Sequence, residues 1–275
     1  MSPNPSAAPV CKVRLCYAKR GKLRFTSHRD VARAFERALR RAGLPMAYSQ
    51  GYHPHPKVSW VGASPTGAAS EAEYVEIALV EHLDPEMVRA RLDAALPEGL
   101  AMLEGVVAGP GSLADRIDAS AWRIEVRGVD RAHLRQAADL LLAAPKVFVE
   151  RVTKDGLRSI DARAAIVSLE VADDSTVLPA PDQLGRCGIL VAVVRQVSPA
   201  VRPDDVLSAL GAVGGLPSSA LVKAIRIAQG RLDDDGGLVD PFAADRASAR
   251  TAAAGKTLAQ PDDGSHQLDV AGHTG

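Results

Sequence analysis

The order of strand-like and helix-like periodicity along the chain is the feature that most limits its fold. Strands are predicted where apolar and polar residues alternate, and helices where apolar residues recur every three or four positions. The elements predicted in the first part are a strand at 12–18 that continues at 23–25, a helix at 28–42, extended pieces at 45–50 and 57–61, a strand at 74–80, a helix at 84–96 and a strand at 101–108.

The same order recurs further along the chain. The predicted elements are strands at 121–127, 146–152, 164–171, 188–194 and 221–229, with helices at 130–143 and 203–210, and one extra strand or insertion near 179–185. Strand, helix, strand, strand, helix, strand is the ferredoxin-like order. The sequence therefore predicts an α+β fold of tandem ferredoxin-like (βαββαβ) modules.

Composition sets the boundaries of these modules. The predicted parts are a flexible arm at 1–10, a first module at 11–108, a Gly/Pro-containing linker at 109–119, a second module at 120–232 and a tail at 233–275. The tail holds 8 acidic and 3 basic residues and has no apolar period. Such a segment buries too little apolar surface to order itself, so we expect a disordered acidic tail.

Charge is unevenly divided although the whole chain is neutral. Residues 1–60 hold 12 Lys or Arg and 2 Asp or Glu, a net charge of +10. Residues 61–275 hold 21 basic and 31 acidic side chains, a net charge of −10. This asymmetry favours an anionic partner for the basic part, and the alternative is that the two parts pair with each other.

A row of arginines marks the helix predicted at 28–42. The row consists of Arg29, Arg33, Arg37 and Arg41. Residues four apart line one helix face, and Val31, Phe35 and Leu39 fall on the opposite face. A cationic face of this kind suits phosphate, which arginine binds bidentately. The alternatives are ion pairing with the acidic part of the chain and a plain solvated face.

Three histidines near this helix are candidates for acid–base chemistry. His28 follows the expected N-cap Ser27, where backbone N–H groups attract anions, and it is either a contact to ligand or an exposed residue of a capping turn. His53 and His55 share one side of the chain if the Pro-rich loop around them is extended. They lack a third ligand for a metal, so the loop is predicted to contact substrate or to be purely structural.

Aromatic residues are concentrated between Tyr17 and Tyr74. Tyr48, Tyr52 and Trp60 lie among His, Gln and Lys, a mixture suited to stacking on bases of single-stranded RNA, although packing under the loop is an equal alternative. Phe25 and Phe35 are expected in the core.

Cofactor motifs are missing from the sequence. There is no P-loop, no strand–GxGxxG–helix unit, no nucleophile elbow and no paired CxxC, so no cofactor and no metal are predicted. No apolar run approaches the roughly 20 residues of a membrane helix, and the first ten residues do not form a secretory signal. Three cysteines do not make a disulfide framework, so we expect a reducing compartment and a cytoplasmic protein.

Four sequence runs resemble an uncharacterised family known as radical SAM-linked or radical SAM-associated proteins. The runs are KLRFTSH at 22–28, YSQGYHPHPK at 48–57, ASEAEY at 69–74 and the weaker SIDAR at 159–163. The resemblance covers roughly residues 11–230 and implies a gene neighbour or fusion partner of the B12-binding radical SAM type. It implies no activity. The chain itself lacks the three-cysteine cluster motif, so it is expected to accompany such an enzyme or to act independently.

These observations together predict an RNA-binding accessory or processing factor acting on tRNA or rRNA, with a radical SAM protein as a further partner and a role in RNA modification. One alternative is an enzyme with histidine-based acid–base chemistry on RNA, and another is a module that presents substrate to a radical SAM protein. The catalytic candidates are His28, His53 and His55, and the predicted nucleic-acid contacts are Arg29, Arg33, Arg37, Arg41, Tyr48, Gln50, Tyr52, Lys57, Arg158 and Arg163.

Overall fold

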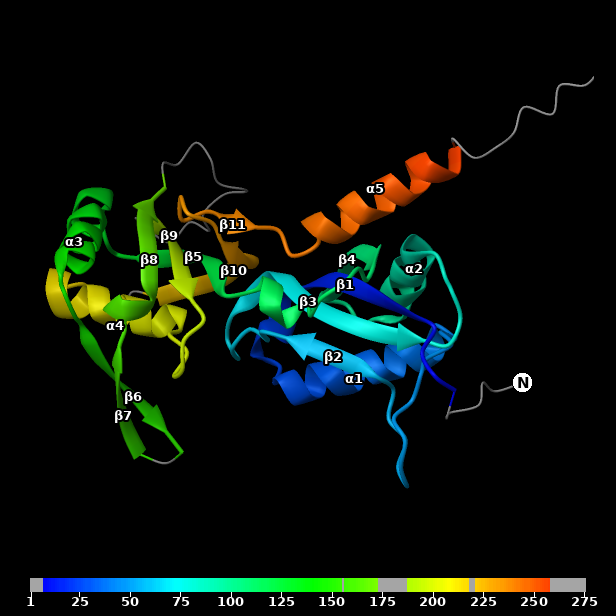
Figure 1. Ribbon diagram of the computed structural model, residues 1–275. Helices are drawn as coiled ribbons and strands as arrows, with labels where there is room; N and C mark the ends of the chain where they lie inside the picture. The colour runs from blue at the N-terminus through cyan, green and yellow to red at the C-terminus, as the bar shows by residue number, and fades with distance from the viewer. Residues whose placement is uncertain (1–6, 155, 173–186, 218–220, 258–275) are drawn as a thin grey trace, which may run out of the picture.

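The first part of the chain folds into a module in which two helices cover one face of a four-stranded sheet (Figure 1). The computed structural model describes residues 7–154, 156–172, 187–217 and 221–257. The elements of the module are β1 (Cys11–Lys19), α1 (His28–Arg41), β2 (Val58–Val61), β3 (Ala69–Leu79), α2 (Pro85–Ala95) and β4 (Leu100–Val107). The strands are antiparallel in the order β4-β1-β3-β2, which confirms the ferredoxin-like prediction.

The second module repeats this arrangement. Its elements are β5 (Ala119–Arg127), α3 (Arg131–Ala143), β8 (Ile166–Val171), β9 (Cys187–Arg195), α4 (Pro203–Gly214) and β10 (Leu221–Leu232). The antiparallel order β10-β5-β9-β8 matches that of the first module position by position. Each module has its own apolar core between its sheet and its two helices.

One continuous sheet joins the modules, because β3 serves both of them. Its first residues pair in parallel with β10, through Ala69 with Ile225 and Ser70 with Arg226. Its later residues pair along the same edge with β2. The last strand of the second module therefore packs beside the central strand pair of the first.

Capping and periodicity account for the helices. The Ser27 side chain accepts a hydrogen bond from the backbone N–H of Asp30 at the start of α1, and Asp84 caps α2 in the same way. On α1 the apolar residues Val31 and Phe35 are buried, as the period predicts. Among the described residues, no helix is both long and apolar enough to cross a membrane.

Two local predictions need correction. The extended piece expected at 23–25 is the end of a 3-10 helix, η1 (Gly21–Phe25), which Gly21 enters with a φ of 57°. The strand expected at 146–152 is one arm of a hairpin, β6 (Phe148–Thr153) with β7 (Gly156–Asp161), which projects from the second module (Figure 1). The insertion expected near 179–185 lies outside the described residues.

The C-terminal segment is also different from the prediction, since residues 233–257 are structured. Strand β11 (Leu238–Val239) pairs with β10, and helix α5 (Ala243–Thr257) follows. Phe242 is fully buried, with its ring edge-on to Tyr74 of the first module. The acidic composition concealed this anchoring because a single buried aromatic hardly changes the average of a polar segment. Residues 258–275 lie outside the described part of the chain.

Candidate nucleic-acid interface

The arginine row lies on the outer face of α1, away from the core of the first module. Val31, Phe35 and Leu39 bury the inner face, and all four arginines of the row are exposed. Successive members are about 6 Å apart along the helix axis, since each is four residues of 1.5 Å rise from the last. The row therefore spans nearly the whole length of α1.

The protein compensates these charges weakly. Arg33 is 3.7 Å from Asp30, a pair between exposed side chains that contributes little to stability. Arg41 donates to the carbonyl oxygen of Ala95 at the end of α2. Arg29 and Arg37 contact no carboxylate within the described residues. The alternative of pairing with the acidic part of the chain is therefore not seen for this row in the part of the chain that the structure describes.

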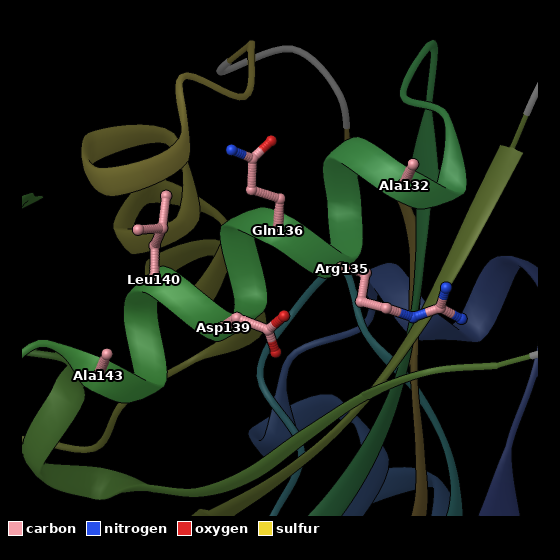
Figure 2. Close-up of a pocket in the computed structure, with 6 residues that line it drawn as sticks. All are labelled: Ala132, Arg135, Gln136, Asp139, Leu140 and Ala143. Carbon is pink, nitrogen blue, oxygen red and sulfur yellow. The ribbon is translucent and has the colours of Figure 1, made fainter.

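A hollow of about 540 Å³ continues the cationic surface at the ends of α1 and α2. Arg41 and Arg91 line it together with small and apolar residues. A second hollow, of about 510 Å³, lies on α3 of the second module. Figure 2 shows that all its lining residues stand on this one helix, with Arg135 and Asp139 on one side and Gln136 on the other. This mixture of signs makes it a weaker anion site than the first.

His28 stands at the first turn of α1 and contacts aromatic residues. Its ring is edge-on to Trp60 of β2, with 5.2 Å between the ring centroids. Trp60 also packs against Tyr17 and Phe35, at 6.0 and 5.0 Å. Trp60 is thus half-buried packing, and His28 is an exposed residue beside it.

The loop 49–55 projects from the module between α1 and β2 (Figure 1). Its base is closed by the bridge between Tyr48 and Pro56 and by the Ser49 N–H, which donates to the carbonyl oxygen of His55 at 2.8 Å. Tyr52 at the tip is 97% exposed, with the His53 ring edge-on to it. Tyr48 is half-buried, so it packs under the loop. Gln50 and Lys57 are exposed on either side.

The structure does not bring the three histidines together. His28 lies at the end of β2 that carries Trp60, whereas the loop with His53 and His55 leaves the other end of this strand (Figure 1). The described residues show no contact between His28 and this loop. The idea that all three surround one reactive position is therefore wrong.

The predicted basic cluster of the second module divides into anchoring and exposed residues. The Arg163 guanidinium donates to the backbone carbonyl oxygens of Leu142 and Ile166, so it fixes the base of the hairpin and is not a surface contact. Arg151 is held by Asp205 of α4. Arg158 alone of these three is exposed on β7, opposite Arg151.

Sequence reasoning missed a buried polar network where the modules meet. Arg226 of β10 forms an ion pair with Glu73 of β3 and donates to Ser70 and Gln229. Burial by itself would raise the pKa of Glu73, but the charge of Arg226 and hydrogen bonds from Ser70, Arg226 and the Ser64 N–H hold it below its ordinary value. A charged residue inside an otherwise apolar strand was the available signal, but its partner is 153 positions away.

Lys19 lies beside this network without a carboxylate of its own. Its side chain is buried, and its ammonium contacts only the carbonyl oxygens of Ser64 and Pro65, at 3.4 and 3.5 Å. Burial lowers the pKa of Lys19. The buried Ser64 hydroxyl has no hydrogen-bond partner. This corner of the module junction therefore has more positive charge than the Glu73 carboxylate compensates.

A second buried arginine holds the C-terminal segment. Arg14 of β1 is bound by Glu76 and, through two hydrogen bonds of 2.9 Å, by Asp245 of α5. Arg116 also donates to Asp245. The carboxylate at the start of α5 thus fastens this helix to the first module.

Comparison with known proteins gives a family and no activity. The family model described as "Uncharacterized protein conserved in bacteria (DUF2344)" matches residues 12–203, well over half of the chain. No curated protein matches the sequence. A chain in the "Crystal Structure of a Cbf5-Nop10-Gar1 Complex" is similar with a TM-score of 0.41 and 13% identity, over 83% of this protein and 52% of that chain. This protein thus spans about half the length of the chain it matches.

The family match includes the two segments that shape the candidate interface, α1 with its arginine row and the loop 49–55. It ends just as α4 begins, before β10 and the C-terminal segment. On the strength of this match, the chain belongs to the family of uncharacterized proteins conserved in bacteria, DUF2344.

Proposed function

We propose that this protein binds RNA of the tRNA or rRNA class, with the arginine row of α1 as its principal contact to the phosphates. The observation that carries the proposal is the exposed row itself, in which only Arg33 has a carboxylate neighbour among the described residues. Like charges four residues apart repel each other by a few tenths of a kcal/mol per pair. Phosphates would relieve this repulsion and accept bidentate hydrogen bonds.

The loop 49–55 extends the proposed interface beyond α1. Tyr52 offers an exposed ring, and His53, His55, Gln50 and Lys57 offer donors around it. Aromatic rings beside cationic side chains are typical of surfaces that bind unpaired bases. In this proposal the arginine row holds the backbone and the loop contacts a base or an end of the RNA.

Charge reversal within the row tests the proposal. We expect the double variant Arg33→Glu/Arg37→Glu to bind a fluorescent tRNA at least about tenfold more weakly than the wild type. The matched control is Arg135→Glu/Arg250→Glu, which makes the same charge change at two exposed arginines of α3 and α5. Equal losses in the two variants would mean that net charge, and not the row, determines binding.

A protein partner is the second candidate, and the β6–β7 hairpin favours it. Phe148, Val152 and Leu157 are exposed on one face of this hairpin, as strand pairing places them together. Exposed apolar clusters of this kind mark protein contacts. We propose that a radical SAM protein, implied by the resemblance of the sequence runs, docks here. Co-purification lost on Val152→Glu but kept in Arg33→Glu/Arg37→Glu would support a separate docking surface.

Free thiols agree with a reducing environment for both roles. Cys11 and Cys16 are unpaired, and burial raises the pKa of the Cys16 thiol to about 12, which makes it unreactive. We propose the cytoplasm as the site of action. Thiol labelling of the protein in intact cells would test this, since oxidised cysteines would contradict it.

A further inference from the structure

Phe25 is exposed at the N-terminal end of the arginine row, although its sequence context predicted a core residue. Its side chain is 61% exposed, whereas Phe35 of α1 is fully buried. A single exposed apolar residue is ordinary on a protein surface. The surroundings of Phe25 distinguish it from that ordinary case.

Hydrogen bonds on both sides hold the backbone around Phe25 in place. The Thr26 N–H donates to Leu23 at 2.9 Å and closes the 3-10 turn of η1. The Gly67 N–H of the following loop donates to the carbonyl oxygen of Arg24 at 2.7 Å. A ring presented from a fixed backbone loses little conformational entropy when it binds a ligand.

The charges around the ring are positive. The guanidinium carbon of Arg24 lies 4.6 Å from the ring centroid of Phe25, close enough to stack on it. Lys22 and Arg29 are exposed on either side in the sequence. The nearby carboxylate of Asp30 is already taken up by Ser27 and Arg33. An apolar protein partner would have to desolvate these cations, whereas a nucleotide supplies both a ring and a phosphate.

We propose that Phe25, backed by Arg24, is a stacking platform for an unpaired nucleobase, so that the bound RNA is single-stranded at this end of the arginine row. This inference rests on the proposed function and deepens it, because it selects single-stranded over duplex RNA. An unpaired base exposes its face for stacking, whereas the bases of an A-form duplex are stacked on each other. The phosphate next to this base would fall within reach of Arg29 at the first turn of α1.

The test compares two phenylalanines of equal exposure. Phe25→Leu keeps an apolar side chain and removes the ring, and Phe148→Leu makes the same change at a residue that is also 61% exposed but lies on the distant hairpin. Both are titrated with a short single-stranded RNA containing 2-aminopurine and with a duplex of equal length. We expect Phe25→Leu to weaken single-strand binding about tenfold and to lose the fluorescence quenching, with duplex binding unchanged. Phe25→Tyr is expected to restore both.

Each outcome separates this inference from the proposed function. If Phe25→Leu binds single strands as well as Phe148→Leu does, while Arg33→Glu/Arg37→Glu loses binding, the stacking platform is wrong and the arginine row stands. An equal loss for duplex and single strand would also overturn it. If the wild-type protein binds neither RNA, both the platform and the proposed function fail.

Discussion

The outer face of α1 and the junction between the two modules both concentrate arginine, but they treat it in opposite ways. At the junction, Arg226 and Arg14 are buried and each is held by carboxylates. On α1, Arg29 and Arg37 are exposed and contact no carboxylate in the described residues. Buried arginines are therefore required by the fold, whereas the exposed ones can be exchanged without loss of packing.

The helix at the equivalent position of the second module sharpens this contrast. Helix α3 follows β5 as α1 follows β1, and Leu134 and Leu141 bury its inner face in the same manner. Its exposed residues include both Arg135 and Asp139 and form no cationic row. The fold thus does not require a row of arginines at this position, which supports a role in binding for the row on α1.

The largest expected effect is the loss of a buried partner. Arg226→Met leaves the Glu73 carboxylate buried without its cation, and removing one member of a buried pair costs about 3–5 kcal/mol of the free energy of unfolding. Urea denaturation measures this loss. Arg37→Met is the matched control on α1 and is expected to change stability by less than about 0.5 kcal/mol. Similar losses in both variants would remove the distinction between the two regions.

The anchor of the C-terminal segment is expected to contribute somewhat less. Asp245→Asn keeps the shape of the side chain but removes the charge that binds Arg14 and Arg116. Because Glu76 still compensates Arg14, we expect a loss of about 2 kcal/mol, the value of a charge-assisted hydrogen bond. Thermal denaturation gives the loss, and limited proteolysis should cut α5 earlier in the variant. An unchanged proteolysis pattern would argue against the fastening.

Acid should weaken the junction in a defined direction. The folded pKa of Glu73 lies below its ordinary value of 4.5, so its stabilising contribution is complete above that pH. It is lost as the pH falls further, through the folded pKa. The free energy of unfolding should therefore decline in acid less steeply in the double variant Glu73→Leu/Arg226→Met than in the wild type. Parallel pH curves for the two proteins would contradict this assignment.

The smallest expected effect is a gain in stability. Lys19 is 3% exposed and has no carboxylate partner, so Lys19→Met removes a buried charge while keeping the volume of the chain. Replacing buried charge by apolar atoms often stabilises a protein, and we expect about 1 kcal/mol at neutral pH. Denaturation at neutral pH measures it. A loss of stability would show that Glu73 depends on Lys19 as well as on Arg226.

Local patterns predicted the elements well because each pattern has a local cause. The alternation in β1, the four-residue period of α1 and the Asp84–Pro85 start of α2 are properties of neighbouring residues. The tandem ferredoxin-like order follows from them. The hairpin β6–β7 and the structured segment around Phe242 were not predicted, because each depends on contacts with distant parts of the chain.

The candidate site was predictable to the extent that it lies on one helix. The spacing of Arg29 and Arg37 places them on one face of α1 wherever that helix packs. The exposure of Phe25 was not predictable, since it depends on how η1 packs against the loop at Gly67. Arg163 was misassigned for the same reason, because its carbonyl partners belong to another element.

The salt dependence of RNA binding tests the central claim most directly. If the row of four arginines holds four phosphates, a plot of log K against log salt concentration should have a slope of about −3 for single-stranded RNA. Arg33→Glu/Arg37→Glu should reduce the steepness by about 1.4, and Arg135→Glu/Arg250→Glu should leave it unchanged. A flat wild-type response, or the same slope in wild type and row variant, would contradict a polyanion-binding role for α1.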